Sequence, residues 1–217
     1  MDIDVKGAII SNDEAWIYDW FEMDYTTPRK ITNALREAKN EKIDVYINSG
    51  GGDIFAGSEI AESLRQYPGE CKIHVVGFAA SAASVIACAR KSDIAPTAMV
   101  MVHNVSSSAH GDTRALAHEA EVLKKANKSI ASAYVQKTGM TEAEALEMMN
   151  NETWLTAQEA VNKGLIDELS VSVSPVVQLV ASYNSGMLPR SVIEKFVNER
   201  NTQKMQAKLN LLKLGGN

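Results

Sequence analysis

Short apolar runs alternate with stretches of helical periodicity along most of the chain. Runs short enough to be strands lie at 5–10, 15–20, 43–47, 73–76 and 98–102. Between them, a capping residue and proline at Thr27-Pro28 open one predicted helix, and the spacing of Ile60 and Leu64 indicates another. Because strand, turn and helix follow one another in this order, we predict an α/β fold with a largely parallel sheet.

A long helical pattern without proline covers 112–137. Its apolar positions are spaced by three or four residues and form a narrow stripe: Leu116, Ala120, Leu123, Ile130 and Tyr134. The length favours a helix that projects and packs on a partner subunit, whereas the periodicity is equally typical of a core-facing helix. Two further helices are predicted, one beginning at 140–142 and one over 154–166 that ends at Gly164.

The composition changes after Ser174-Pro175. Residues 186–217 combine short apolar periodicity, charges and a terminal Gly-Gly. This part is too short to form a core of its own. We therefore predict one domain over 1–174 and a C-terminal helical extension over 175–217.

Composition and charge exclude several classes of protein. The 217 residues carry 22 Lys and Arg against 27 Asp and Glu, a net charge of -5, which argues against nucleic acid as a partner. Neither a signal peptide nor an apolar membrane span is visible, so we expect a cytoplasmic protein without a membrane partner. Cys71 and Cys88 lack metal-ligand spacing and are predicted to be reduced core residues, so we expect neither a metal nor a cofactor.

Three consecutive glycines, at 50–52, follow the predicted strand at 43–47. Each glycine loses much backbone entropy on folding, so the cluster needs a physical reason. A tight turn between strand and helix is one explanation. The other is a ligand that must approach bare backbone N–H groups, as an oxyanion does.

Ser81 begins a helix that follows the strand at 73–76, and the alanines around it leave room for a substrate. A serine becomes a nucleophile only when a base removes its proton, so a histidine is required. His74 lies within an apolar strand, while His110 and His118 are expected at the surface. His103 ends an apolar run and would stand at a strand terminus, which makes it our candidate base.

Four motifs in unbroken order, from about residue 40 to 170, resemble those of the ClpP family of serine peptidases. The motifs are Tyr46-Ile47-Asn48-Ser49-x-Gly51-Gly52, Gly77-x-Ala79-Ala80-Ser81, Met101-Val102-His103 and Trp154-Leu155-Thr156-Ala157-x-Glu159-Ala160-x-x-x-Gly164-Leu165-Ile166-Asp167. The resemblance implies a ClpP/crotonase-like fold of repeated ββα units with a projecting long helix.

The resemblance also implies a set of catalytic residues for a serine endopeptidase. Ser81 matches the nucleophile and His103 the general base, while Gly52 and Ala82 match the two backbone N–H donors of the oxyanion hole. The family has an aspartate where this chain has Glu152, and a glutamate can also orient an imidazolium. Asn151 and Asp167 are the alternatives for this third group.

Other features qualify the resemblance and suggest partners. Gly50 replaces a proline of the family, and almost nothing precedes Val5, whereas the family has a segment that lines an axial pore and helps to meet an ATPase. Together with the motif ETWLTAQEA and the apolar tail, these features make the chain similar to the ClpP-related head maturation proteases of phages and prophages. The implied partners are peptide or protein substrates, such as a capsid or scaffold protein, and further copies of the chain in stacked rings, which have seven subunits in the family. The sequence itself implies no partner ATPase.

Two alternatives belong to other functional classes, and a third is a variant of the serine peptidase. A crotonase-like enzyme would use the same paired N–H donors on an acyl-coenzyme A thioester. A non-catalytic assembly protein could keep the fold, since the position of the acid is altered. A serine-lysine signal-peptide peptidase shares the Ala-Ser environment, but no membrane anchor is seen in the sequence.

Overall fold

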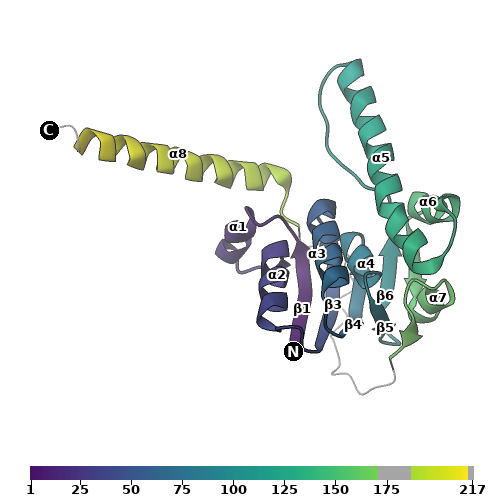
Figure 1. Cartoon of the computed structure of the whole chain (residues 1–217). Helices are drawn as coiled ribbons and strands as arrows, with labels where there is room; N and C mark the ends of the chain where they lie inside the picture. Colours follow the sequence, from purple (N-terminus) through teal and green to yellow (C-terminus); the bar gives the residue numbers. More distant parts are fainter. Residues whose placement is uncertain (171–186, 215–217) are drawn as a thin grey trace.

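A mostly parallel sheet forms the centre of the molecule (Figure 1). The computed structural model describes residues 1–170 and 187–214. Within these residues the sheet has eight strands. They are β1 (Asp2–Ile9), β2 (Tyr25–Thr26), β3 (Ile43–Gly52), β4 (Cys71–Ala80), β5 (Lys91–Ile94), β6 (Met99–Val102), β7 (Thr153–Thr156) and β8 (Glu168–Leu169).

Helices connect these strands in the predicted alternation. They are α1 (Ala15–Trp20), α2 (Pro28–Glu37), α3 (Ile54–Gln66), α4 (Ala82–Ala87), α5 (Thr113–Thr138), α6 (Glu142–Asn150), α7 (Ala157–Asn162) and α8 (Arg190–Leu214). Every paired strand is parallel to its neighbour except for β6 and β7, which are antiparallel. The predicted α/β class and the largely parallel sheet are therefore confirmed.

Strand β4 divides the sheet because its two halves pair with different strands. Residues 72–75 pair with β5, whereas residues 78–80 pair with β6. On its other side β4 pairs with β3. The carboxyl ends of β3, β4 and β6 therefore lie next to one another.

One face of the sheet is buried beneath α2, α3 and α4. The alternating burial along β3 and β4 places Ile43, Val45 and Ile47, with Ile73 and Val75, in the main core. The opposite positions on these strands are half-buried, as period-two alternation requires. Helix α2 begins as predicted, because Thr27 caps it by accepting a hydrogen bond from the Lys30 N–H and a proline follows.

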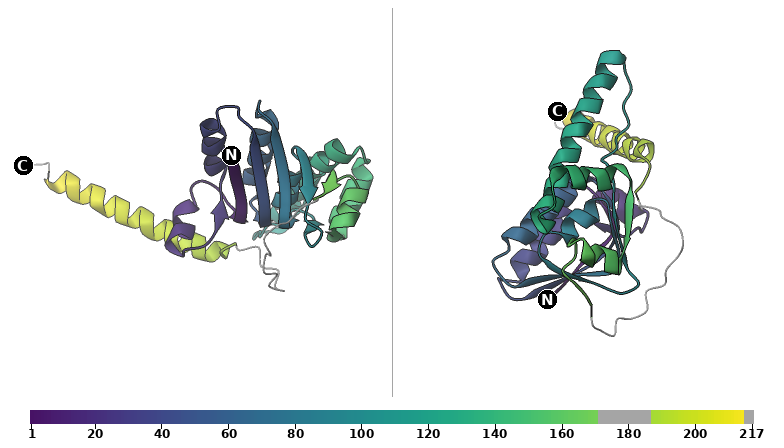
Figure 2. Two further views of the ribbon diagram at one scale, coloured as in Figure 1. Left: turned by 90° about the horizontal axis from the view of Figure 1, so that it is seen from below. Right: turned by 90° about the vertical axis from the view of Figure 1, so that its right-hand side faces the viewer.

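Helix α5 projects from the domain, as Figures 1 and 2 show. Near its C-terminal end Ile130 and Tyr134 are buried in the main core. Toward its N-terminal end Leu116 is 47% exposed, although the sequence pattern placed it on the same apolar stripe. The structure thus favours the projecting interpretation over the core-facing one for the N-terminal half.

Two predictions of secondary structure were wrong. The run at 15–20 was predicted as a strand, but it is the helix α1, which buries only Ile17 and Tyr18. Its aromatic residues raise β propensity, yet packing against α8 decides the conformation, with Trp16 and Phe21 both in edge contact with Phe196. The predicted helix at 154–166 begins later, because residues 153–156 form β7 against β6 before α7 starts.

The described contacts of the C-terminal helix α8 with the domain come from its first three turns. Ile193 joins Ile17 and Tyr18 in a small second core, and the Tyr18 hydroxyl accepts a hydrogen bond from the Leu188 N–H at 3.0 Å. The rest of α8 extends away from the body of the molecule (Figure 2). The domain boundary predicted at 174/175 lies outside the described residues and stays a prediction. None of the helices in the described ranges is apolar over a length that could cross a bilayer.

A buried ammonium group ties α5 to the sheet. Lys137 Nζ donates to the Asp167 carboxylate at 2.5 Å and to the Arg90 carbonyl at 2.9 Å, and its side chain is only 10% exposed. Asp167 also accepts from the Ser92 N–H at 2.7 Å. Burial alone would raise the pKa of Asp167, but the bonds from Lys137 and Ser92 outweigh it and hold this pKa below the ordinary value of 3.8.

Replacing this lysine should destabilise the fold. We expect Lys137→Met to lower the free energy of unfolding at pH 7 by about 1–3 kcal/mol, since a charge-assisted bond is lost and a carbonyl is left without its donor. Lys42→Met is the matched control, because Lys42 and Glu70 form an ion pair in which both side chains are more than half exposed. Its effect should stay within about 0.5 kcal/mol in urea titrations at equal protein concentration.

The difference between wild type and Lys137→Met should also depend on pH. A carboxyl whose pKa is lowered in the folded state stabilises that state fully above the unfolded pKa, and the stabilisation is lost as the pH falls through the folded pKa. The difference should therefore be largest above pH 3.8 and shrink below it. An equal loss for both lysine variants, or no shrinkage in acid, would contradict this account.

Candidate active site

Ser81 occupies a strained turn directly after β4. Its φ of 54° and ψ of -125° lie in a region that residues other than glycine rarely adopt. The turn is held from the sheet, because the Ser81 N–H donates to the Met101 carbonyl at 2.9 Å and so extends the β4 and β6 ladder by one residue. Ser81 is partly exposed in this turn, so a substrate can reach its side chain.

His103 reaches Ser81 because it follows β6 directly. Ala80 and Met101 are paired in the ladder, so residues just beyond both strands share one edge. The distance from His103 Nε2 to Ser81 Oγ is 2.8 Å. This is hydrogen-bond distance for a base and the hydroxyl that it would activate.

The other three histidines lie elsewhere. His74 is on β4, with its two ring nitrogens 2.8 Å from Asp93 and 3.1 Å from Asp44. His110 and His118 are exposed, on the loop before α5 and on α5 itself. Of the four candidates that the sequence offered, the structure brings only His103 to Ser81.

The glycines belong to the end of β3 instead of forming a separate turn. Gly51 and Gly52 have φ values of 87° and 146°. A Cβ atom on Gly51 would lie 2.6 Å from the Ala80 carbonyl oxygen and 2.9 Å from the Ala82 nitrogen, and one on Gly52 would lie 2.1 Å from the Ile9 oxygen. The backbone therefore approaches the Ser81 turn as closely as glycine alone allows.

The surface beside Ser81 is a shallow depression with a mostly apolar lining. Its volume is about 10 Å³, and Ile54, Val85, Val105 and Ile130 contribute to its walls beside Ser81 and His103. Ile130 and Tyr134 bring α5 to this site, a contribution that no local pattern predicted.

Among the described residues, Glu152 forms no hydrogen bond with the His103 imidazole. Glu152 is exposed, has a φ of 45°, and accepts a hydrogen bond from Trp154 Nε1 at 3.3 Å. Of the two alternatives, Asn151 follows the last turn of α6 and Asp167 is engaged by Lys137 and Ser92. None of the three has a hydrogen bond to His103 in the described part of the chain.

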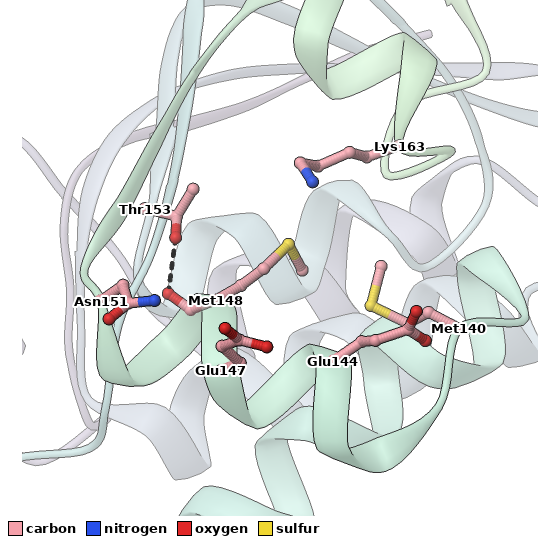
Figure 3. Close-up of a pocket in the computed structure, with 7 residues that line it drawn as sticks. All are labelled: Met140, Glu144, Glu147, Met148, Asn151, Thr153 and Lys163. Atoms are coloured by element: carbon pink, nitrogen blue, oxygen red, sulfur yellow. Dashed lines mark hydrogen bonds between the residues drawn. The ribbon is translucent and has the colours of Figure 1, made fainter.

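A larger pocket, of about 460 Å³, lies between α6 and α7 (Figure 3). Lys163 faces it from one side, and Glu144 and Glu147 line the other. Neither Ser81 nor His103 lines it, so it is not the place where these two could act. Its only link to the predicted site residues is Asn151.

The two cysteines behave as apolar core residues. Cys71 and Cys88 are both buried and unpaired. Burial raises the pKa of Cys88 to about 12, so its thiol is protonated at neutral pH and is a poor nucleophile or metal ligand. Within residues 1–170 and 187–214 no three His, Cys, Asp or Glu side chains gather as metal ligands would.

Comparison with known proteins identifies the family. The sequence model of the family described as "Clp protease" matches residues 22–172. The chain belongs to the Clp protease family. It is therefore a peptidase by family, and the predicted ClpP-type fold is confirmed.

Curated relatives agree with this assignment to the Clp family. The ATP-dependent Clp protease proteolytic subunit 1 of Streptomyces avermitilis is 30% identical over 147 residues, which cover 65% of this chain and 68% of the relative. The ATP-dependent Clp protease proteolytic subunit of Chlorella vulgaris is 29% identical over 138 residues, or 62% and 69% of the two chains. Subunit 3 of Rhodococcus jostii is 28% identical over 148 residues, or 65% and 73%.

A side chain at Gly51 should abolish peptidase activity in this Clp-family chain. We expect Gly51→Ala to lower kcat/KM by about 100-fold or more, because its Cβ would press on Ser81 and on the Ala82 N–H. Activity would be measured on a fluorogenic peptide, alongside thermal unfolding.

Gly139→Ala is the matched control, because Gly139 also has a positive φ, 76°, but an added Cβ would meet nothing within 4 Å. It should cost about 1–2 kcal/mol of stability through backbone strain and leave kcat/KM unchanged. Comparable kcat/KM values for the two folded variants would refute the idea that Gly51 clears space at the site.

Proposed function

We propose that this chain is a serine endopeptidase that cleaves peptide bonds through an acyl-enzyme on Ser81. The observation that carries the proposal is the 2.8 Å distance between His103 Nε2 and Ser81 Oγ, on a turn directly beside Gly51 and Gly52. Because the chain belongs to a peptidase family, the pair can be interpreted as a nucleophile and its general base. A buried structural hydrogen bond would not require the strained φ of Ser81 or bare backbone opposite it.

The proposed reaction uses the Ser81 hydroxyl, the His103 imidazole and two backbone N–H groups. His103 Nε2 takes the hydroxyl proton as Ser81 Oγ attacks the scissile carbonyl, and the N–H groups of Gly52 and Ala82 stabilise the oxyanion. His103 then protonates the leaving amine. Water, deprotonated by the same imidazole, attacks the acyl carbon; the bond to Ser81 Oγ breaks, His103 returns the proton to that oxygen, and the acid product leaves.

Glu152 is our proposed orienting group for His103. It would accept a hydrogen bond from Nδ1 and stabilise the imidazolium, as a carboxylate does in related triads. Its carboxylate would have to leave Trp154 to do so. Glu152 has a positive φ and lies in the turn between α6 and β7. It directly precedes β7, the strand that pairs with β6.

We infer that the substrate is a protein or peptide and that several copies of the chain assemble into a ring. The names of the relatives, proteolytic subunits of Clp proteases, support the first part. The second part is supported by α5, whose N-terminal half stands clear of its own domain and is free to pack on another copy. The ETWLTAQEA motif supports the proposal that the substrate is a phage or prophage capsid or scaffold protein.

The nucleophile can be tested with a covalent probe. A fluorophosphonate should label wild type at Ser81, and the label should be mapped to that residue by peptide mass spectrometry. Ser81→Ala should lose both labelling and hydrolysis of a fluorogenic peptide, with a fall in kcat of about 10³-fold or more. Ser106→Ala, in the exposed loop after β6, is the serine control and should behave as wild type.

Labelling that survives in Ser81→Ala would disprove the assignment of the nucleophile. A wild-type protein that forms rings but neither reacts with the probe nor cleaves casein would instead support the non-catalytic assembly protein.

The role of Glu152 predicts a loss in kcat. Glu152→Gln should lower kcat by at least about tenfold with little change in KM, since an amide cannot stabilise the imidazolium. Glu147→Gln is the control, because Glu147 is also exposed at the end of α6 and faces the pocket of Figure 3. Equal kcat values for both variants and wild type would remove Glu152 from the mechanism.

A further inference from the structure

The carbonyl oxygen of Ser81 is held by a buried chain of hydrogen bonds that reaches α5. It accepts from the Ser84 N–H at 2.9 Å and from Ser84 Oγ at 2.6 Å. Ser84 Oγ is also 2.8 Å from the Tyr134 hydroxyl. Ser84 and Tyr134 are each 1% exposed, so these bonds are shielded from water.

The direction of donation in this chain follows from the acceptor at its end. A carbonyl oxygen can only accept, so Ser84 must use its single hydroxyl proton on Ser81. Ser84 Oγ is then the acceptor for Tyr134, whose hydroxyl is the donor. Burial raises the pKa of Tyr134 above its ordinary value, which keeps this proton in place.

The held carbonyl belongs to the same peptide group as the Ala82 N–H. A trans peptide is planar, with its C=O and N–H pointing in opposite directions, so fixing the Ser81 oxygen also fixes the direction of the Ala82 N–H. Hydrogen bonds accepted by a carbonyl also polarise the peptide and make its N–H a stronger donor. Both effects act on the group proposed as an oxyanion donor.

We propose that Ser84 and Tyr134 are positioning residues for the Ala82 oxyanion donor, acting through the Ser81–Ala82 peptide. The inference rests on the proposed function, because it assigns a task to one of its parts. Neither side chain touches the substrate carbonyl in this scheme. Tyr134 comes from α5, so the orientation of the donor depends on a helix outside the β4 and α4 turn.

Three variants test this chain in the full-length protein: Tyr134→Phe, Ser84→Ala and the double variant. We expect kcat to fall about threefold for Tyr134→Phe and about tenfold for Ser84→Ala, a fraction of the 10²–10³-fold that removal of a whole donor costs. KM should stay within about twofold, since the effect arises in the transition state. The double variant should resemble Ser84→Ala, because Tyr134 acts only through Ser84.

A transition-state analogue separates positioning from a general loss of stability. A peptide aldehyde that forms a hemiacetal with Ser81 places an oxyanion in the hole, so its Ki should weaken by the same factor as kcat. The controls are Tyr67→Phe, which removes a hydrogen bond from a buried tyrosine hydroxyl to the Glu41 carbonyl, and Ser132→Ala, which removes a serine hydroxyl from the exposed side of α5. Both should leave kcat and Ki unchanged.

The outcomes distinguish this inference from the proposed function. If wild type reacts with a fluorophosphonate at Ser81 but the Ser84 and Tyr134 variants match their controls in kcat and Ki, only the positioning role is overturned. If wild type does not react at all, the proposed function fails and the inference fails with it. Should Ser84→Ala not fold, Tyr134→Phe, which loses a single oxygen atom, still decides the question.

Discussion

The pairing of β4 with β6 is the constraint on which the candidate site depends. It sets Ala80 opposite Met101, and one more hydrogen bond, from the Ser81 N–H to the Met101 carbonyl, carries this register past the end of β4. Since His103 comes two residues after Met101, its imidazole reaches Ser81 without any long loop. A shift of one residue would turn His103 to the opposite face of the sheet and separate the pair.

The same edge concentrates backbone strain. Ser81 adopts a φ of 54°, and Gly51 and Gly52 take up conformations in which a side chain would collide with the neighbouring strands. The positive φ of Ser81 costs about 1–3 kcal/mol, whereas glycine adopts a positive φ without that cost, so the surrounding structure must enforce the conformation of Ser81. The parallel ladders on both sides of β4 and the core residues beneath them supply that enforcement, and the Ser84 and Tyr134 hydroxyls secure the far side of the turn.

Much of this arrangement could be predicted from the sequence, because strong local signals agree with the fold. The cap at Thr27, the helical pattern over 112–137 and the apolar run ending at His103 all mark real elements. The failures have a different origin. The aromatic run at 15–20 is helical because α8, far away in sequence, packs on it, and 153–156 is a strand because β6 offers it an edge.

The site could be predicted only in part, because contacts between segments far apart in the sequence decide the rest. Ser81 and His103 follow strand ends and the glycines close β3, and local patterns mark all of these positions. Tyr134 looked like an ordinary apolar position of a helix, and nothing local shows that its hydroxyl meets Ser84. Whether Glu152 serves His103 depends on a turn conformation and a competing bond to Trp154, neither of which a motif specifies.

The most direct test of the central claim is a crystal structure of the protein after reaction with a small fluorophosphonate. Our account predicts a covalent bond from Ser81 Oγ to phosphorus and a phosphoryl oxygen about 2.7–3.1 Å from the backbone nitrogens of both Gly52 and Ala82. His103 Nε2 should remain beside Ser81 Oγ. A protein that takes up no adduct, or an adduct whose phosphoryl oxygen points away from both nitrogens, would contradict it.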